Sequence, residues 1–216
     1  MKTDDLILQL AHDAAPVRLL PSPAKRTALW LAVGLPYIAL IVFMMSPRAD
    51  LTERLAEPRF LVEAGMALAT AMAAAFAAFS AVVPGRPRWL LLLPVLPLSV
   101  WLGSLGQGCL DILLRASPFV LGWDWVCIPA ITIAGAVPAL AMLLMLRRGA
   151  PLYPCATVAL GALAATALGG FGLRLFHPQD ASLMVLVWQF GTVALLTALA
   201  GCSGRRILVW PRLKLS

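Results

Sequence analysis

Residues 60–83 read FLVEAGMALATAMAAAFAAFSAVV, and this segment decides the fold class. Glu63 is its one ionisable side chain, and nearly all the others are apolar. A helix that crosses the hydrocarbon core of a bilayer needs about 20 consecutive, mostly apolar residues. The apolar run is continuous, whereas the strands of a membrane barrel alternate between apolar and polar residues. The segment therefore predicts a transmembrane helix.

Further stretches of the chain have the same length and character. The predicted spans are Ala28–Met45, Phe60–Val83, Trp89–Gly106, Val126–Leu146, Pro154–Phe176 and Leu183–Cys202. Six spans place both ends of the chain on the same side of the membrane. We therefore expect an all-α polytopic membrane protein in three parts. These are an N-terminal segment at residues 1–27, a six-helix transmembrane domain at 28–204 and a basic tail at 205–216.

The overall composition agrees with a membrane protein. Hydrophobic residues make up 61% of the 216 residues, charged residues only 12%, and the mean hydropathy is +0.89. Soluble domains carry about 25% charged residues. Because so few polar side chains cannot cover a water-exposed surface, the composition excludes an ordinary soluble enzyme, a disordered regulator and a disulfide-stapled secreted module.

Positive charges are distributed unevenly over the loops between these spans. The chain has 17 Lys and Arg against 10 Asp and Glu. One side of the membrane receives Lys2, Arg18, Lys25, Arg26, Arg86, Arg88, Arg147, Arg148, Arg205, Arg206, Arg212 and Lys214. The other side receives Arg48, Arg54, Arg59, Arg115 and Arg174. Cytoplasmic loops carry the excess of Lys and Arg, so the first side is expected to be cytoplasmic. The basic tail is expected to rest on anionic lipid rather than on nucleic acid.

The N-terminal segment is expected to hold a short amphipathic helix. The residues that indicate it are Thr3 as a cap, Asp4 and Asp5 in the first turn, Leu6, Leu10 and Ala14 on one stripe, and Pro16 at the end. Such a helix is too short to be stable alone in water. It could lie on the membrane surface, but interfacial helices favour Lys and Arg. The acids, Asp13 included, therefore favour a protein partner with a basic groove.

Small residues recur every four positions in two of the spans. Ala67, Ala71 and Ala75 form one such series, Ala69, Ala73 and Ala77 a second, and Gly161, Ala165 and Gly169 a third. Small residues at this spacing predict helices that pack closely. Glu63 and Arg174 lie near the outer ends of their spans, where we expect them to extend towards water. A transport site usually shows charges deeper in the membrane, so a small transporter or accessory subunit is the second interpretation.

One sequence fragment suggests catalysis. Gly201-Cys202-Ser203-Gly204 resembles the GxSG element of rhomboid-type intramembrane serine proteases. Its serine would need a histidine within hydrogen-bond reach. His177 is expected on the opposite side of the membrane, roughly 30–40 Å away at 1.5 Å per helical residue, and His12 lies in the N-terminal segment. A membrane enzyme is therefore the third interpretation, and we expect no enzymatic activity.

The four cysteines divide between the two sides. Cys155 and Cys202 are expected at cytoplasmic helix ends, where thiols stay reduced. Cys109 and Cys127 are expected at the outer face, together with His177. Several interpretations remain: a disulfide in an oxidising periplasm, a partial soft-metal site with His177, or plain packing residues.

Several segments resemble the NrsF family of proteobacterial membrane proteins over nearly the whole chain. They are the opening Met1–Ile7 with Leu10–Arg18, then Pro58–Phe60, Trp125–Pro129 with its Cys127, Leu146–Pro151, and finally His177, Asp180–Leu183 and Trp188. The resemblance implies a six-helix anti-sigma factor of the bacterial inner membrane with a cytoplasmic N-terminus. Such a protein sequesters an extracytoplasmic-function (ECF) sigma factor and releases it under envelope, oxidative or metal stress.

The resemblance also implies functional residues. The sigma-factor-binding residues would be Asp4, Asp5, Leu6, Leu10, Asp13, Pro16 and Val17. The family's stress sensing involves two outer-face cysteines, of which one matches Cys127. The other would directly follow His177, where this chain has Pro178. Either Cys109 replaces the second cysteine, or the protein senses a different signal, or it does not sense through thiols. No cofactor, small-molecule substrate or direct nucleic-acid contact is expected.

Overall fold

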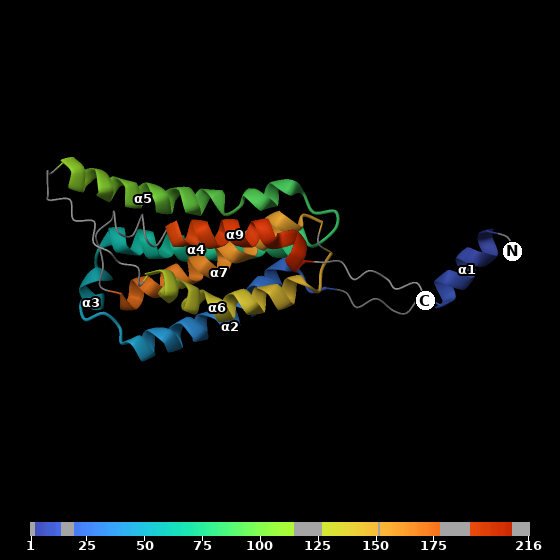
Figure 1. Cartoon of the computed structure of the whole chain (residues 1–216), viewed down its shortest axis with the longest axis horizontal. Coiled ribbons are helices and arrows are strands. Elements are labelled where there is room, and N and C mark those ends of the chain that lie inside the picture. Colours follow the sequence, from blue (N-terminus) through green and yellow to red (C-terminus); the bar gives the residue numbers. More distant parts are fainter. Residues whose placement is uncertain (1–2, 14–19, 115–126, 151, 178–190, 209–216) are drawn as a thin grey trace.

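The computed structural model describes residues 3–13, 20–114, 127–150, 152–177 and 191–208. Within these ranges every regular element is helical, which confirms the all-α class (Figure 1). The elements are α1 (Thr3–Asp13), α2 (Pro23–Met45), α3 (Leu51–Arg54), α4 (Pro58–Ala81), the 3-10 helix η1 (Arg88–Leu92), α5 (Val95–Leu114), α6 (Cys127–Leu146), α7 (Pro154–Phe176) and α9 (Gly191–Ile207).

Within the described residues, five helical stretches are long and apolar enough to cross a membrane. They are Pro23–Met45, Pro58–Ala81, Arg88–Leu105, Ile128–Leu146 and Pro154–Phe176. These agree closely with the first five predicted spans. Of the sixth, Leu183–Cys202, residues 183–190 lie outside the described part of the chain and residues 191–202 belong to α9.

The first membrane helix begins earlier than the predicted Ala28. Pro23 occupies the first helical position, where its missing N–H breaks no hydrogen bond. The Ser22 side chain accepts a hydrogen bond from the Lys25 N–H at 3.3 Å and so caps the helix. These start signals bring Lys25 and Arg26 inside the helix, although apolar character alone had left them in the preceding segment.

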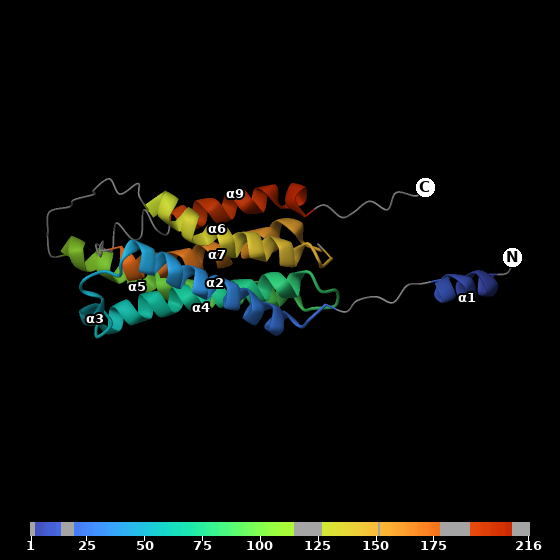
Figure 2. The ribbon, with the colours of Figure 1, turned by 90° about the horizontal axis from the view of Figure 1, so that it is seen from below.

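Helix α7 lies at the centre of the bundle, in contact with α2, α4, α6 and α9 (Figures 1 and 2). About two thirds of it is buried, the largest share among the five membrane helices. Glycine allows the close approach: a Cβ atom on Gly169 would lie 3.0 Å from the Ile131 carbonyl oxygen of α6. On α4, Ala67, Ala71 and Ala75 are fully buried. The prediction of close packing at these small residues is therefore confirmed.

The helix ends form two faces of opposite character. At one end, the Ala150 N–H donates to the Val82 carbonyl at 3.1 Å and joins two loops. We call this the basic end; its charged residues are Lys25, Arg26, Arg86, Arg88, Arg147, Arg148, Arg205 and Arg206. At the other end, the Arg48 N–H donates to the Leu175 carbonyl at 3.2 Å. We call this the ion-pair end; its charged residues include Arg48, Asp50, Glu53, Arg54, Glu57, Arg59, Glu63 and Arg174. The bundle thus separates these residues into the same two groups as the predicted spans.

Candidate functional site

Helix α1 carries the residues that the sequence suggested for partner binding. It lies apart from the bundle, beyond the basic end, in both views (Figures 1 and 2). Asp4 and Asp5 are exposed in its first turn, where carboxylates favour the positive helix N-terminus. Ile7 and Leu8 are also exposed, at 58% and 70%. The helix therefore presents acidic and apolar side chains together.

The remaining binding candidates fall partly or wholly outside the described part of the chain. The backbone of Leu6, Leu10 and Asp13 belongs to α1, but their side chains are not described. Pro16 and Val17 lie outside the described residues altogether. Their proposed roles therefore stay predictions.

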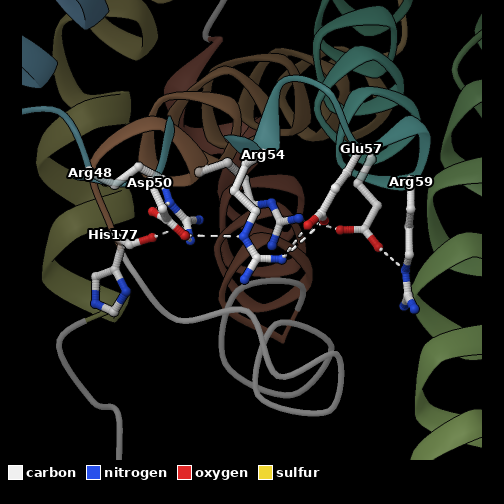
Figure 3. A network of polar contacts seen from close by, with 8 residues as sticks. Arg48, Asp50, Arg54, Glu57, Arg59 and His177 are labelled. Carbon is white, nitrogen blue, oxygen red and sulfur yellow. Dashed lines mark hydrogen bonds and ion pairs between the residues drawn. The ribbon is translucent and has the colours of Figure 1, made fainter. Parts of the chain in front are cut away.

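At the ion-pair end, one carboxylate holds two arginines of the loop that joins α2 to α4. Asp50 accepts two hydrogen bonds from Arg48, Nε to Oδ1 at 2.7 Å and Nη2 to Oδ2 at 2.8 Å (Figure 3). Arg54 Nε donates to Oδ2 of the same carboxylate at 3.1 Å. The hydrogen bonds from Arg48 and then from Arg54 lower the pKa of Asp50 well below its ordinary value of 3.8. Asp50 is therefore a permanent anion at neutral pH.

The network continues along the same face (Figure 3). Arg54 Nη1 donates to both oxygens of Glu57, at 3.1 and 3.0 Å. Arg59 Nε donates to Glu63 Oε1 at 3.0 Å, and Arg59 Nη2 donates to the Ser104 carbonyl of α5 at 3.2 Å. These contacts tie the loop, α4 and α5 together at one end of the bundle.

Glu63 and Arg174 form a buried ion pair rather than extending to water. Their side chains are 4% and 8% exposed, and Arg174 Nη2 donates to Glu63 Oε2. The Arg174 guanidinium also lies 5.1 Å from the centroid of the buried Phe60 ring. The expectation that both side chains reach the solvent was wrong, because each supplies the countercharge that the other needs inside the protein. Both sit within two turns of a helix end, and the pair joins α4 to α7.

The candidate sensing residues lie on this end only in part. His177 follows α7, and its carbonyl accepts a hydrogen bond from Arg48 Nη1 at 3.5 Å (Figure 3). Cys109 belongs to α5 and Cys127 begins α6, but their side chains are outside the described part of the chain. Within the described residues, no three His, Cys, Asp or Glu side chains are grouped for metal binding. The disulfide and the metal site of Cys109, Cys127 and His177 therefore stay predictions.

The basic end contains a buried charge that sequence reasoning missed. Arg26 is 3% exposed; Nη2 donates to the Met145 carbonyl of α6, and the guanidinium lies 4.5 Å from the Phe79 ring centroid. From the sequence, Arg26 is expected only to be one of the charges that set the orientation in the membrane. A signal was available, because Arg26, Trp30, Gly34 and Ile38 recur every four residues and all four are buried.

Ser203 and His177 lie at opposite ends of the bundle, as the sequence predicts. Ser203 is exposed, and its neighbour Gly204 packs against Cys155 at the start of α7. His177 directly follows the last residue of that 23-residue helix. The length of α7 therefore separates Ser203 from His177. Cys155 and Cys202, near the same basic end, are free thiols, half-buried and exposed respectively.

Comparison with known proteins identifies a family. The family model described as NrsF, negative regulator of sigma F, matches residues 10–210. Neither the curated proteins nor the solved structures give a match. The matched range includes the last four residues of α1, Leu10–Asp13, and every helix of the bundle. With nearly the whole chain covered, this helical membrane protein belongs to the NrsF family, whose members are negative regulators of a sigma factor.

Proposed function

We propose that the protein is an anti-sigma factor that holds an ECF sigma factor at the cytoplasmic face of the bacterial inner membrane through α1. Family membership supplies the regulatory role and implies a sigma factor as partner. The main support for this binding site is helix α1. It lies apart from the bundle and exposes both carboxylates and apolar side chains. A non-catalytic regulator agrees with the family description.

The chemistry of α1 indicates the kind of groove that binds it. Burial of an exposed Ile or Leu side chain contributes about 1.5–3 kcal/mol, so Ile7 and Leu8 call for an apolar floor. Asp4 and Asp5 would pair with Lys or Arg side chains at the rim of that groove. An 11-residue helix is marginal in isolation. Contact with the sigma factor would therefore stabilise the helix while it binds.

The orientation follows from charge. The basic end carries eight Lys and Arg side chains, and no Asp or Glu of the described bundle lies there. Because Lys and Arg favour the cytoplasmic side, the basic end and α1 would face the transcription machinery. The ion-pair end would face the periplasm, as would the termini of α5 and α6 that carry Cys109 and Cys127.

Release needs a stimulus that binds or modifies one arrangement of the bundle more favourably than another. Envelope, oxidative or metal stress at the outer face would act first on Cys127, with Cys109 as the candidate second thiol in view of Pro178. His177 lies next to the polar contacts that connect α4, α5 and α7, namely the Arg59–Ser104 hydrogen bond and the Glu63–Arg174 ion pair. A change at these residues would then alter helix packing and the presentation of α1.

The proposal is tested by copurification of an ECF sigma factor, for example one encoded next to this gene, with the full-length membrane protein. Deletion of residues 2–17 is expected to abolish capture. The charge reversals Asp4→Lys and Asp5→Lys are expected to reduce capture at least about tenfold, as the loss of charge-assisted contacts predicts. Glu53→Lys is the matched control, because Glu53 is an exposed acid at the opposite end. Full capture by the deletion variant would overturn the α1 site.

Orientation and sensing are tested separately. In a variant whose four native cysteines are replaced by Ser, a Cys substituted for Leu8 should resist a membrane-impermeant thiol reagent in intact cells and react after lysis. In a reporter strain, Cys109→Ser and Cys127→Ser should each change stress induction. Cys155→Ser and Cys202→Ser, at the other end, should not. Normal induction in both outer variants would reject the thiol mechanism and leave the sigma-binding role standing.

A further inference from the structure

A small hollow opens at the basic end, between the end of α4, the loop before η1 and the start of α7. Its lining includes Ser80, Arg86, Arg88, Leu91 and Tyr153. The hollow holds about 20 Å³ of space. That volume accommodates one water-sized group, such as a single oxygen atom of a larger ligand.

The ends of three membrane helices place this hollow at the level of the lipid headgroups. Ser80 lies in the last turn of the Pro58–Ala81 span, and Arg88 is the first residue of the Arg88–Leu105 span. Tyr153 directly precedes the Pro154–Phe176 span. Trp89, beside the hollow, is 61% exposed. Tyr and Trp are enriched at membrane–water interfaces, which agrees with this depth.

The charges and the free hydroxyl around the hollow favour a bound anion. Arg86 and Arg88 are exposed at its rim, and the Arg88 guanidinium lies 5.5 Å from the Tyr153 ring centroid. No Asp or Glu from the described residues of the bundle lies at this end. Ser80 is 1% exposed, and its buried hydroxyl has no hydrogen-bond partner among the described residues. A buried hydroxyl without a partner is unfavourable, and a bound oxygen acceptor would satisfy it.

The backbone around the hollow is held in one shape. Gly85 has a φ of +79°, a conformation that favours glycine, and Pro84 and Pro87 restrict the chain on either side of it. The Ala150 N–H donates to the Val82 carbonyl at 3.1 Å and holds the loop before α7 against the end of α4. The backbone that carries the two arginines is therefore restricted before any ligand arrives.

We propose that this hollow binds the phosphate group of an anionic phospholipid. One phosphate oxygen enters the hollow and accepts a hydrogen bond from the Ser80 hydroxyl, and Arg86 and Arg88 neutralise the charge. The apolar Leu91 and Leu152 of the lining face the acyl chains. The site would anchor the basic end at the membrane surface. It does not depend on sigma-factor binding or on which side of the membrane the basic end faces.

The test measures lipid binding by the full-length protein in detergent micelles, titrated with phosphatidylglycerol, with phosphatidylcholine and with inorganic phosphate. Native mass spectrometry counts the bound lipids. The pair Arg86→Gln and Arg88→Gln is compared with Arg147→Gln and Arg148→Gln, which removes the same charge from exposed residues of the same end. Ser80→Ala removes the buried hydroxyl without changing the charge. Arg88→Lys keeps the positive charge but removes the guanidinium group.

We expect phosphatidylglycerol to bind more tightly than phosphatidylcholine. The Arg86/Arg88 pair should weaken that binding at least about tenfold, and Ser80→Ala about fivefold. The Arg147/Arg148 pair should weaken it less than about threefold. Equal losses in the two arginine pairs would show diffuse charge attraction and overturn the site. Equal binding of both lipids, or binding of inorganic phosphate as tight as that of phosphatidylglycerol, would overturn the assignment to an anionic lipid.

Discussion

The two ends of the bundle use arginine in opposite ways. At the ion-pair end, Arg48, Arg54, Arg59 and Arg174 face Asp50, Glu57 and Glu63, and the Glu63–Arg174 pair joins α4 to α7. At the basic end, the described bundle offers no carboxylate, so its only buried arginine, Arg26, uses a backbone carbonyl and an aromatic ring instead. Charge therefore holds helices together at one end, whereas at the other every described Lys and Arg side chain except Arg26 is exposed.

The strongest test of this contrast removes the buried carboxylate. Glu63→Gln keeps the side-chain volume but leaves Arg174 buried without its countercharge. Breaking a buried ion pair on one side costs about 3–5 kcal/mol. We expect a loss of this size in the free energy of unfolding, measured by circular dichroism in mixed detergent micelles.

Glu57→Gln provides the matched control for that variant. Glu57 is half exposed, and among the described residues it pairs with Arg54, three positions earlier in the connection before α4. Exposed pairs contribute about 0–1 kcal/mol. If the two Gln variants lost the same stability, the burial of Glu63 would not matter and the contrast between the ends would fail.

The stability of the basic end should depend instead on the close packing of small residues. A Cβ on Gly204 would lie 2.6 Å from both the Cys155 Cα and the Pro154 carbonyl oxygen, so Gly204→Ala must push α9 away from α7. Overpacking of this kind costs about 1–3 kcal/mol. The same unfolding measurement should report it.

Gly65→Ala is the comparison for Gly204→Ala. No atom lies within 4 Å of a Cβ at Gly65, on the exposed side of α4. Alanine favours a helix over glycine by up to about 1 kcal/mol, so this variant should be neutral or slightly more stable. A stable Gly204→Ala protein would mean that α9 does not pack on α7 as described.

Arg26→Met should have a smaller effect than Glu63→Gln, although both residues are nearly fully buried. Methionine leaves no unpaired charge behind, and it retains an apolar contact with Phe79. The loss is the hydrogen bond to the Met145 carbonyl, worth about 0.5–1.5 kcal/mol. Chemical unfolding of the two variants side by side checks the order, and a larger loss for Arg26→Met would reverse the contrast.

The sequence predicted the fold far better than the contacts within it. Membrane helices are recognisable because their apolar runs are long and local, and the five described spans begin and end near the predicted residues. The division of charged loops into two faces followed from counting those spans. The start of α2 at Pro23 was missed because the span was located by its apolar residues alone. The N-cap at Ser22 and the proline at the first helical position precede that apolar run.

Contacts between distant residues could not be predicted in the same way. Glu63 and Arg174 are separated by 111 positions, and nothing in the local sequence indicates that α4 and α7 bring them together. Each looked like a single charge near a helix end, for which extension towards water is the usual outcome. The Ser80–Arg88–Tyr153 hollow depends on three separate segments for the same reason.

The smallest expected effect concerns pH at the ion-pair end. Arg48 and Arg54 lower the pKa of Asp50 below its ordinary value of 3.8, so the folded protein binds this proton less readily than the unfolded chain. The stabilisation is fully present above pH 3.8 and is lost only as the pH falls further towards the lowered value. Asp50→Asn should therefore reduce stability equally at pH 7 and pH 5, and the difference from the unsubstituted protein should shrink only below pH 3.8. Unfolding curves across this range measure it. A difference that vanished already between pH 7 and pH 5 would mean that the arginines do not hold Asp50 as an anion, and mild acidification could then disrupt the ion-pair end.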